Sequence, residues 1–161
     1  MKVRMFAAAV AATASMLFAA APAAAQSLTS VIAAAQAQLG GEVYDASRVG
    51  NLAEVELLSN GRLIDAILVL ETGELIASES FGTGRRAAQV GTALNRAALT
   101  LPEAIDAALE AVGPGDVLEA ELRVTGQQSG RQFIVDVRTG SGLFDVIVDA
   151  ANGRIIRIIR D

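Results

Sequence analysis

Carboxylates are the main candidates for acid–base chemistry in this sequence, because the 161-residue chain contains no histidine and no cysteine. That absence excludes Ser-His-Asp and Cys-His nucleophile systems, zinc sites of the His or Cys type, haem attachment and thiol redox chemistry. The one lysine, Lys2, lies in a segment that we expect to be removed. Schiff-base chemistry and Ser-Lys dyads are therefore excluded from the remaining chain as well.

Several carboxylates are near enough in the sequence to be considered as pairs. They are Glu119 with Glu121, Glu54 with Glu56, and Asp136 with Asp145 and Asp149. An acid–base pair needs burial or a partner that separates its two pKa values. These carboxylates alternate with apolar residues, so we expect them on the solvated face of a sheet, supported by cross-strand arginines at Arg123, Arg138 and Arg154. We therefore predict that the protein is not an enzyme.

Two further binding chemistries are weakly supported. The carboxylates could bind a hard cation such as calcium, but no loop has the D-x-D-x-D-G spacing that calcium loops use. Gly82-Thr83-Gly84, followed by two arginines, could cradle a phosphate, but no strand-to-helix context or Walker lysine accompanies it. We expect a flexible linker there, and we predict no cofactor and no metal site.

The elements that must position these residues occur in two similar series. In the first series, apolar residues at helical spacing over 28–39 follow Ser27 as a candidate N-cap and precede Gly40-Gly41. Strands are expected over 53–58, 63–70 and 74–78, separated by the turn dipeptides Asn60-Gly61 and Thr72-Gly73. We expect residues 81–98 to be a linker, or a loop with a short helix of its own.

The second series has sharper signals. Thr100 to Glu103 forms a capping-box pattern with Pro102 in the first turn, and the predicted helix over 101–112 ends at Gly113. Strands are expected over 117–125, 132–139, 143–149 and 154–160. Isoleucines on both faces of the last strand fit either a central strand covered on both sides or an edge strand. The predicted fold class is α+β, with one helix on an antiparallel meander in each unit.

The first 25 residues have the features of a secretory signal peptide. Lys2 and Arg4 precede an uncharged, alanine-rich run that ends in small residues at 23–25. Cleavage before Gln26 is the favoured interpretation, and a retained membrane anchor is the alternative. The disulfide-free, arginine-rich composition fits a bacterial periplasm, so we predict a periplasmic or secreted protein.

The charge of the remaining chain limits its partners. After loss of Lys2 and Arg4, 11 arginines stand against 18 acidic residues, which gives a net charge of −7. Binding to nucleic acid requires clustered Lys and Arg, and anionic membranes attract the same residues. We therefore predict no nucleic-acid partner and no membrane association after cleavage.

Four segments of the second series resemble successive pieces of a PepSY domain. They are Leu101-Pro102-Glu103-Ala104-Ile105, residues 115–122, residues 133–139 and residues 145–153, which ends in Asp149-Ala150-Ala151-Asn152-Gly153. The last piece resembles the VDA-x-TG pattern of the family, with Asn152 where threonine is usual. Residues 53–57 and 68–75 resemble a diverged second copy. The predicted organisation is a signal peptide at 1–25, a first unit at 26–80, a linker at 81–98 and a second unit at 99–161.

The resemblance implies a role, because PepSY domains occur in propeptides of secreted metallopeptidases and in small exported bacterial proteins. It implies a protein partner, such as an exported peptidase that the module inhibits or a membrane sensor. A periplasmic small-ligand or cation-binding accessory protein is the alternative, and a hydrolase is a distant third. We predict a partner-binding patch on the sheet face away from the helix, formed by Ile134, Asp136, Arg138, Asp145, Ile147 and Asp149.

Overall fold

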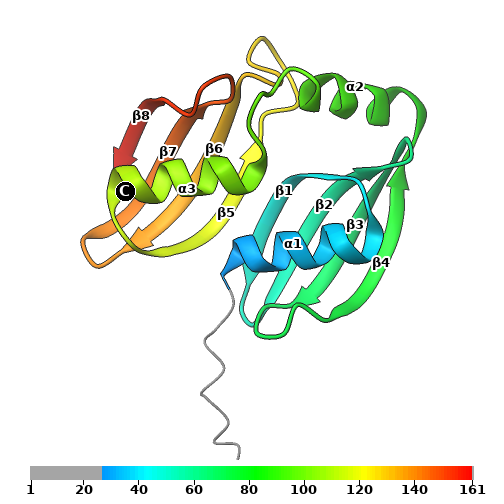
Figure 1. Cartoon of the computed structure of the whole chain (residues 1–161), viewed down its shortest axis with the longest axis horizontal. Coiled ribbons are helices and arrows are strands. Elements are labelled where there is room, and N and C mark those ends of the chain that lie inside the picture. The colour runs from blue at the N-terminus through cyan, green and yellow to red at the C-terminus, as the bar shows by residue number, and fades with distance from the viewer. Residues whose placement is uncertain (1–26, 161) are drawn as a thin grey trace, which may run out of the picture.

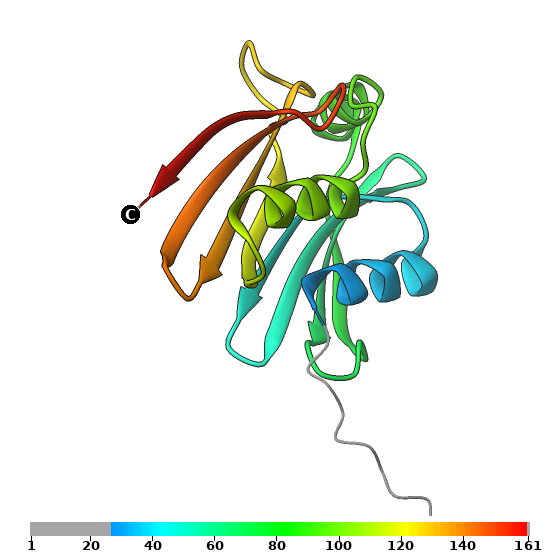
Figure 2. The ribbon, with the colours of Figure 1, turned by 60° about the vertical axis from the view of Figure 1, so that its left-hand side comes forward.

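The computed structural model describes residues 27–160, and the predicted signal peptide lies outside this range. Within it, eight strands form one antiparallel sheet in the order β4-β3-β2-β1-β5-β6-β7-β8. Helices α1 and α3 lie on the same side of this sheet (Figures 1 and 2). The described part of the chain is therefore an α+β fold, as the sequence predicts. None of its helices is long and apolar enough to cross a membrane.

The same order of elements occurs twice along the chain. The first series is α1 (Leu28–Leu39), β1 (Glu42–Val49), β2 (Leu52–Ser59), β3 (Arg62–Val69) and β4 (Leu75–Gly82). After α2 (Gly84–Leu94), the second series is α3 (Leu101–Val112), β5 (Asp116–Leu122), β6 (Gln132–Thr139), β7 (Gly142–Asp149) and β8 (Ile155–Arg160). Each series is thus one long helix followed by four strands.

Local capping explains why α1 and α3 begin and end where the sequence predicts. Ser27 accepts a hydrogen bond from the backbone N–H of Ser30, and Gly40 ends α1 with a φ of 68°. At α3 the predicted capping box is present. The Thr100 side chain accepts a hydrogen bond from the backbone N–H of Glu103, and the Glu103 carboxylate accepts one from the backbone N–H of Thr100. Both predicted helix ranges are confirmed.

The strand β1 was missed by the sequence analysis, which expected three strands in the first series. The reason is a bulge at Tyr44, where the pairing of β1 with β2 shifts between Val43 and Asp45. Val43 and Tyr44 are consecutive and both buried, so the strict alternation that identifies a strand is broken. Without this strand, the two series could not form one sheet.

A short seam joins the two halves of the sheet. Strands β1 and β5 pair only at Asp45 with Glu121, Ala46 with Ala120, and Ser47 with Glu119. Ala46 and Ala120 lie at the centre, and the two series extend outward from this pair in opposite directions. We call these three residue pairs the seam.

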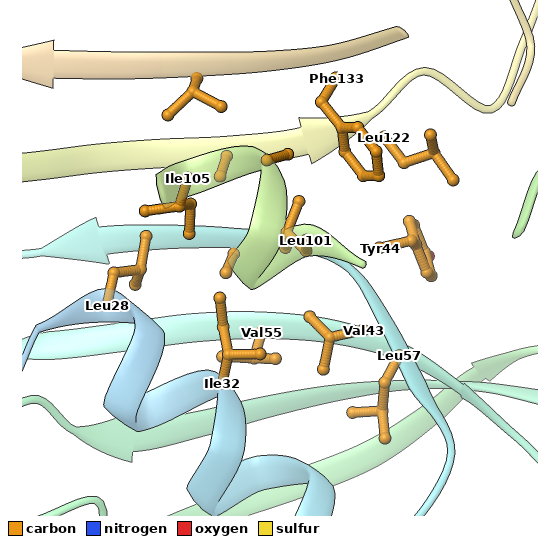
Figure 3. Packing of buried hydrophobic residues seen from close by; sticks show 14 of the residues in the cluster. Leu28, Ile32, Val43, Tyr44, Val55, Leu57, Leu101, Ile105, Leu122 and Phe133 are labelled. Atoms are coloured by element: carbon orange, nitrogen blue, oxygen red, sulfur yellow. The ribbon is translucent and has the colours of Figure 1, made fainter. Parts of the chain in front are cut away.

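One hydrophobic core lies between the sheet and the two long helices and spans both series. Helix α1 contributes Leu28 and Ile32, and α3 contributes Leu101 and Ile105 at the equivalent positions (Figure 3). All four side chains are buried. Alternate residues of β6 and β7 also face the helices as predicted, and they are Phe133, Val135, Val137, Phe144, Val146 and Val148.

Strand β8 lies at one edge of the sheet, as Figure 2 shows, so the central-strand interpretation of its isoleucines was wrong. Ile156, Ile158 and Ile159 are among the exposed large apolar residues. The guanidinium of Arg160 lies 5.8 Å from the centre of the Phe144 ring on the neighbouring strand β7. Charged side chains on an edge strand oppose unwanted pairing with other chains.

The stretch 81–98 contains the end of β4 and the whole of α2. Ala87, Val90 and Ala93 of α2 are buried. A Cβ at Gly91 would lie only 3.2 Å from Leu58, a residue that points away from α1. Helix α2 therefore packs against the other face of the sheet, at the end of the first series, and no other helix of residues 27–160 covers the rest of that face.

Candidate functional site: the open face of the sheet

The face of the sheet opposite α1 and α3 is called the open face here. It carries the six residues of the predicted patch. These residues alternate along β6 and β7 with the apolar residues that face the helices, so they point to the opposite side of the sheet. Ile134 lies directly opposite Ile147, and Asp136 lies directly opposite Asp145. The structure thus brings four of the six predicted residues together as two adjacent cross-strand pairs.

The other two predicted residues lie at opposite ends of these strands. Arg138 is exposed and pairs with Leu143, where the hairpin between β6 and β7 turns. Asp149 lies opposite Gln132, and its Oδ1 accepts a hydrogen bond of 2.8 Å from the backbone N–H of Ala151. This contact holds the turn between β7 and β8, so Asp149 has a local structural role.

The open face also contains a row of five carboxylates, one on each of five consecutive strands. From β4 to β5 they are Glu79, Asp65, Glu56, Asp45 and Glu121, and each lies directly opposite the next. We call this set the acidic row. Beyond Glu121 the same row continues with Ile134, Ile147 and Arg157. One line across the open face therefore changes from acidic to apolar to basic.

A second acidic stretch runs beside the first on β5, β6 and β7. Glu119 lies opposite Asp136, which lies opposite Asp145. The carboxylates do lie on the face away from the helices, as the sequence predicts. The residues directly opposite them are other carboxylates and not arginines. Like charges at directly opposed positions destabilise a sheet.

Asp45 is the most perturbed carboxyl of the acidic row. Its burial, followed by the nearby carboxylates of Glu56, Glu121, Glu119 and Glu54 in that order, raises its pKa to about 7. Both causes disfavour the ionised form, because charge is lost when an acid is protonated. Asp45 therefore holds a proton in the folded protein over a pH range in which an ordinary aspartate is ionised.

Asp65, two strands away, is perturbed in the same direction. Burial raises its pKa, and the carboxylates of Glu54, Glu56 and Glu79 add to this effect. Its Oδ1 atom is buried and has no hydrogen-bond partner. A hollow of about 270 Å³ lies beside it, lined by Asp65, Ile67, Ala77, Ser78 and Glu79.

Tyr44 closes one side of the acidic row. The bulge turns its buried side chain toward the open face, where its hydroxyl donates a hydrogen bond to Oε2 of Glu56. Burial and the Glu56 carboxylate both raise the pKa of Tyr44, whereas the positive charge of Arg86 on α2 opposes the rise. The phenol therefore stays protonated and acts as a donor.

Asp45, Asp65 and Glu79 belong to this site although the sequence did not predict them. Asp45 lies on the strand that was not predicted, and no sequence motif links it to Glu121. Only the strand register brings the five carboxylates into line, and register depends on bulges and turns across the whole sheet. Four of the five alternate with apolar residues, which any half-buried strand shows, and Glu79 stands between two serines.

The arrangement favours binding over catalysis. Strands lie roughly 4.8 Å apart, so the carboxylates form a line rather than converging on one point. Among residues 27–160, no group of three or more His, Cys, Asp or Glu side chains is placed to hold a metal ion. The open face instead offers apolar side chains next to charged ones over several strands.

Comparison with known proteins agrees with this fold. Residues 98–159 match the family model described as "Peptidase propeptide and YPEB domain" (PepSY), which confirms the resemblance seen in the second series. A solved structure of a "putative lipoprotein" from Clostridium difficile 630 is similar with a TM-score of 0.51 and 16% identity. The similarity covers 85% of this chain and 94% of that one. No curated protein matches the sequence.

Proposed function

We propose that the protein is an exported, non-catalytic module that binds and modulates a protein partner through the open face of its sheet. The observation that carries this proposal is the Ile134–Ile147 pair, which lies in direct register on a face that no helix of the second series covers. Charged residues of both signs surround it, since Glu121 and Arg157 are its neighbours along the row. Apolar centres with charged rims are typical of protein interfaces.

The PepSY match supports the kind of partner. PepSY domains occur in propeptides of secreted peptidases, so an exported peptidase is the first partner to test. The two series of elements further support two PepSY-like units at 26–80 and 99–161, connected through 81–98. Export is supported by the signal-peptide pattern of residues 1–25 and places the protein in a bacterial periplasm or outside the cell.

The test replaces both isoleucines of the patch. In the Ile134→Thr/Ile147→Thr protein the strands should remain, because threonine suits strands, but the apolar contact area is removed. The parent and the variant are each used as bait in an extract of exported proteins, and any captured peptidase is assayed for hydrolysis of a peptide substrate. We expect the variant to melt like the parent, to capture less of the partner and to inhibit it less.

A matched control carries the same changes elsewhere. Ile67 and Ile76 are exposed isoleucines of the first series, 37% and 56% accessible. Ile67 also lies on the open face, but on β3 and outside the predicted patch, so the Ile67→Thr/Ile76→Thr protein should capture and inhibit as the parent does if the patch is the binding surface. If the patch variant is also indistinguishable from the parent, the open face of β6 and β7 is not the binding surface.

The acidic row is the observation that favours a second function, a small-ligand or cation-binding accessory protein. Calcium takes six to eight oxygen ligands at about 2.3–2.6 Å, which a straight line of carboxylates supplies poorly. A cation that binds only the folded protein must raise its melting temperature. Calorimetry in millimolar calcium or zinc decides this point, and an unchanged melting temperature would eliminate the cation-binding function.

A further inference from the structure

The seam between β1 and β5 has few side-chain contacts of its own. On the helix side its only pair is Ala46 with Ala120, whose small side chains bury little apolar area. On the open face its pairs are Asp45 with Glu121 and Ser47 with Glu119. The seam therefore depends on backbone hydrogen bonds and on the helices above it, and a carboxylate pair spans it directly.

Bulges on both sides leave this seam shorter than the other ladders. The register shifts at Tyr44 in β1 and at Leu118 in β5, immediately before the paired residues. Every other neighbouring pair of strands is joined over at least five residue pairs. The seam is consequently the part of the sheet that repulsion between charges can separate most easily, because the fewest other contacts hold its two strands together.

We propose that the carboxylates at the seam form a proton-sensitive joint, which is closed when Asp45 is protonated and weakened when it ionises beside Glu121. A protonated Asp45 removes one of the two opposed charges and gains a hydrogen-bond donor. An ionised Asp45 faces carboxylates on both neighbouring strands. This regulation is independent of which partner binds, and it couples the relative position of the two halves to pH.

The charged groups around Asp45 all bear on this joint. Across β2 they are Glu56 and Glu54, across β5 they are Glu121 and Glu119, and on β1 itself they are Glu42 and Arg48. On the open face α2 contributes Arg86, whose charge reaches Tyr44. On the opposite face α1 has no charged residue, and α3 has Glu103, Asp106 and Glu110. The surroundings are thus dominated by acids, and the strongest effects come from the adjacent strands.

The direction of the pH effect follows from the raised pKa of Asp45. When the joint opens, Asp45 moves away from Glu121 and Glu119 and gains solvent, while Glu56 stays beside it on β2, so its pKa falls below the closed-state value. When the joint is closed, it titrates at about 7. The stabilisation from protonation is complete below the open-state pKa, decreases as the pH rises through the range between the two pKa values, and is lost above about pH 7. Across this window, opening should increase by up to tenfold per pH unit.

Hydrogen–deuterium exchange of the mature protein tests the joint directly. Protection factors, corrected for the intrinsic effect of pH, are measured from pH 4.5 to pH 8.5 for the amides of residues 45–47 and 119–121. We expect protection to fall with rising pH at these residues and to remain constant in the hairpin of β6 and β7. In the Asp45→Asn protein, whose amide cannot ionise, protection at the seam should stay high and independent of pH.

Two further variants keep the test decisive. Glu79→Gln changes an acid of the same row, but at its far end on β4, and should leave the seam as in the parent. If Asp45→Asn does not fold, Glu121→Gln removes the opposed charge instead. In this variant the fall of seam protection with rising pH should be smaller than in the parent. Protection at the seam that is equally independent of pH in the parent, or equally dependent on pH in Asp45→Asn, would overturn the proposal.

Discussion

Truncation of two equivalent core residues tests whether the two series fold as one body. Ile32 on α1 and Ile105 on α3 occupy matching positions in their helices, and both are fully buried in the shared core. Ile32→Ala and Ile105→Ala each remove the same atoms from the same kind of site. Any difference in response must therefore come from the surroundings, not from the substitution.

The expected magnitude follows from the burial of each side chain. Replacing a buried isoleucine by alanine costs about 2–5 kcal/mol, because apolar transfer energy is lost and a cavity remains. For a chain of this size, such a loss lowers the melting temperature by roughly 7–18 °C. Because the core is continuous across the seam, we expect each variant to show one transition at a lower temperature, with both halves melting together.

Differential scanning calorimetry at pH 5, where the seam is expected to be closed, is the assay. Agreement between the calorimetric and van't Hoff enthalpies identifies a single cooperative transition. Ile76→Ala is the control, since Ile76 is 56% exposed on an edge strand and its loss should change stability by less than about 0.5 kcal/mol. Two transitions, with only the mutated half destabilised, would refute a single cooperative core.

Three other predictions concern local features. Thr100→Ala removes the side-chain half of the α3 capping box and should lower the free energy of unfolding by about 1 kcal/mol, measured by urea denaturation, with Thr100→Ser retaining most of it. Gly41→Ala should lower the melting temperature more than an exposed substitution does, because Gly41 has a φ of 90° and an added Cβ would collide with the backbone carbonyl of Leu58. Gly140→Ala is the matched control, since Gly140 has open space around it. The segment 99–161 should fold alone with modest stability, and a flat, uncooperative melt would contradict this.

The helices and most strands could be predicted because their signals are local. The start of helix α3 is predicted by Thr100, Pro102 and Glu103, and the apolar stripe that follows them can be recognised without knowing the sheet. Strand β6 alternates without interruption, so its predicted range was also correct. Fold class follows from such elements, because a helix with one apolar stripe and strands with one apolar face have few ways to bury both.

The seam and the acidic row could not be predicted because they depend on contacts between distant segments. Tyr44 interrupts the alternation of β1, and the pairing of Asp45 with Glu121 joins residues far apart in the sequence. Acidic residues that each look solvated along the chain become one another's neighbours once five strands are in register. The predicted patch was placed correctly on the open face because its two strands are joined by a short hairpin, which fixes their register locally.

The way in which the two series join explains why an open face exists at all. Each series has one long helix, which covers one face of its four strands. If the two series packed face to face, their second faces would be buried against each other. They instead pair edge to edge through β1 and β5, which puts α1 and α3 on one side and leaves the other side covered only by α2 among residues 27–160 (Figure 1). A sheet face that stays exposed to water is expected to carry charged side chains, as the acidic row does. The Ile134–Ile147 pair departs from that rule on the same face, and this departure is the reason why we propose a binding surface there.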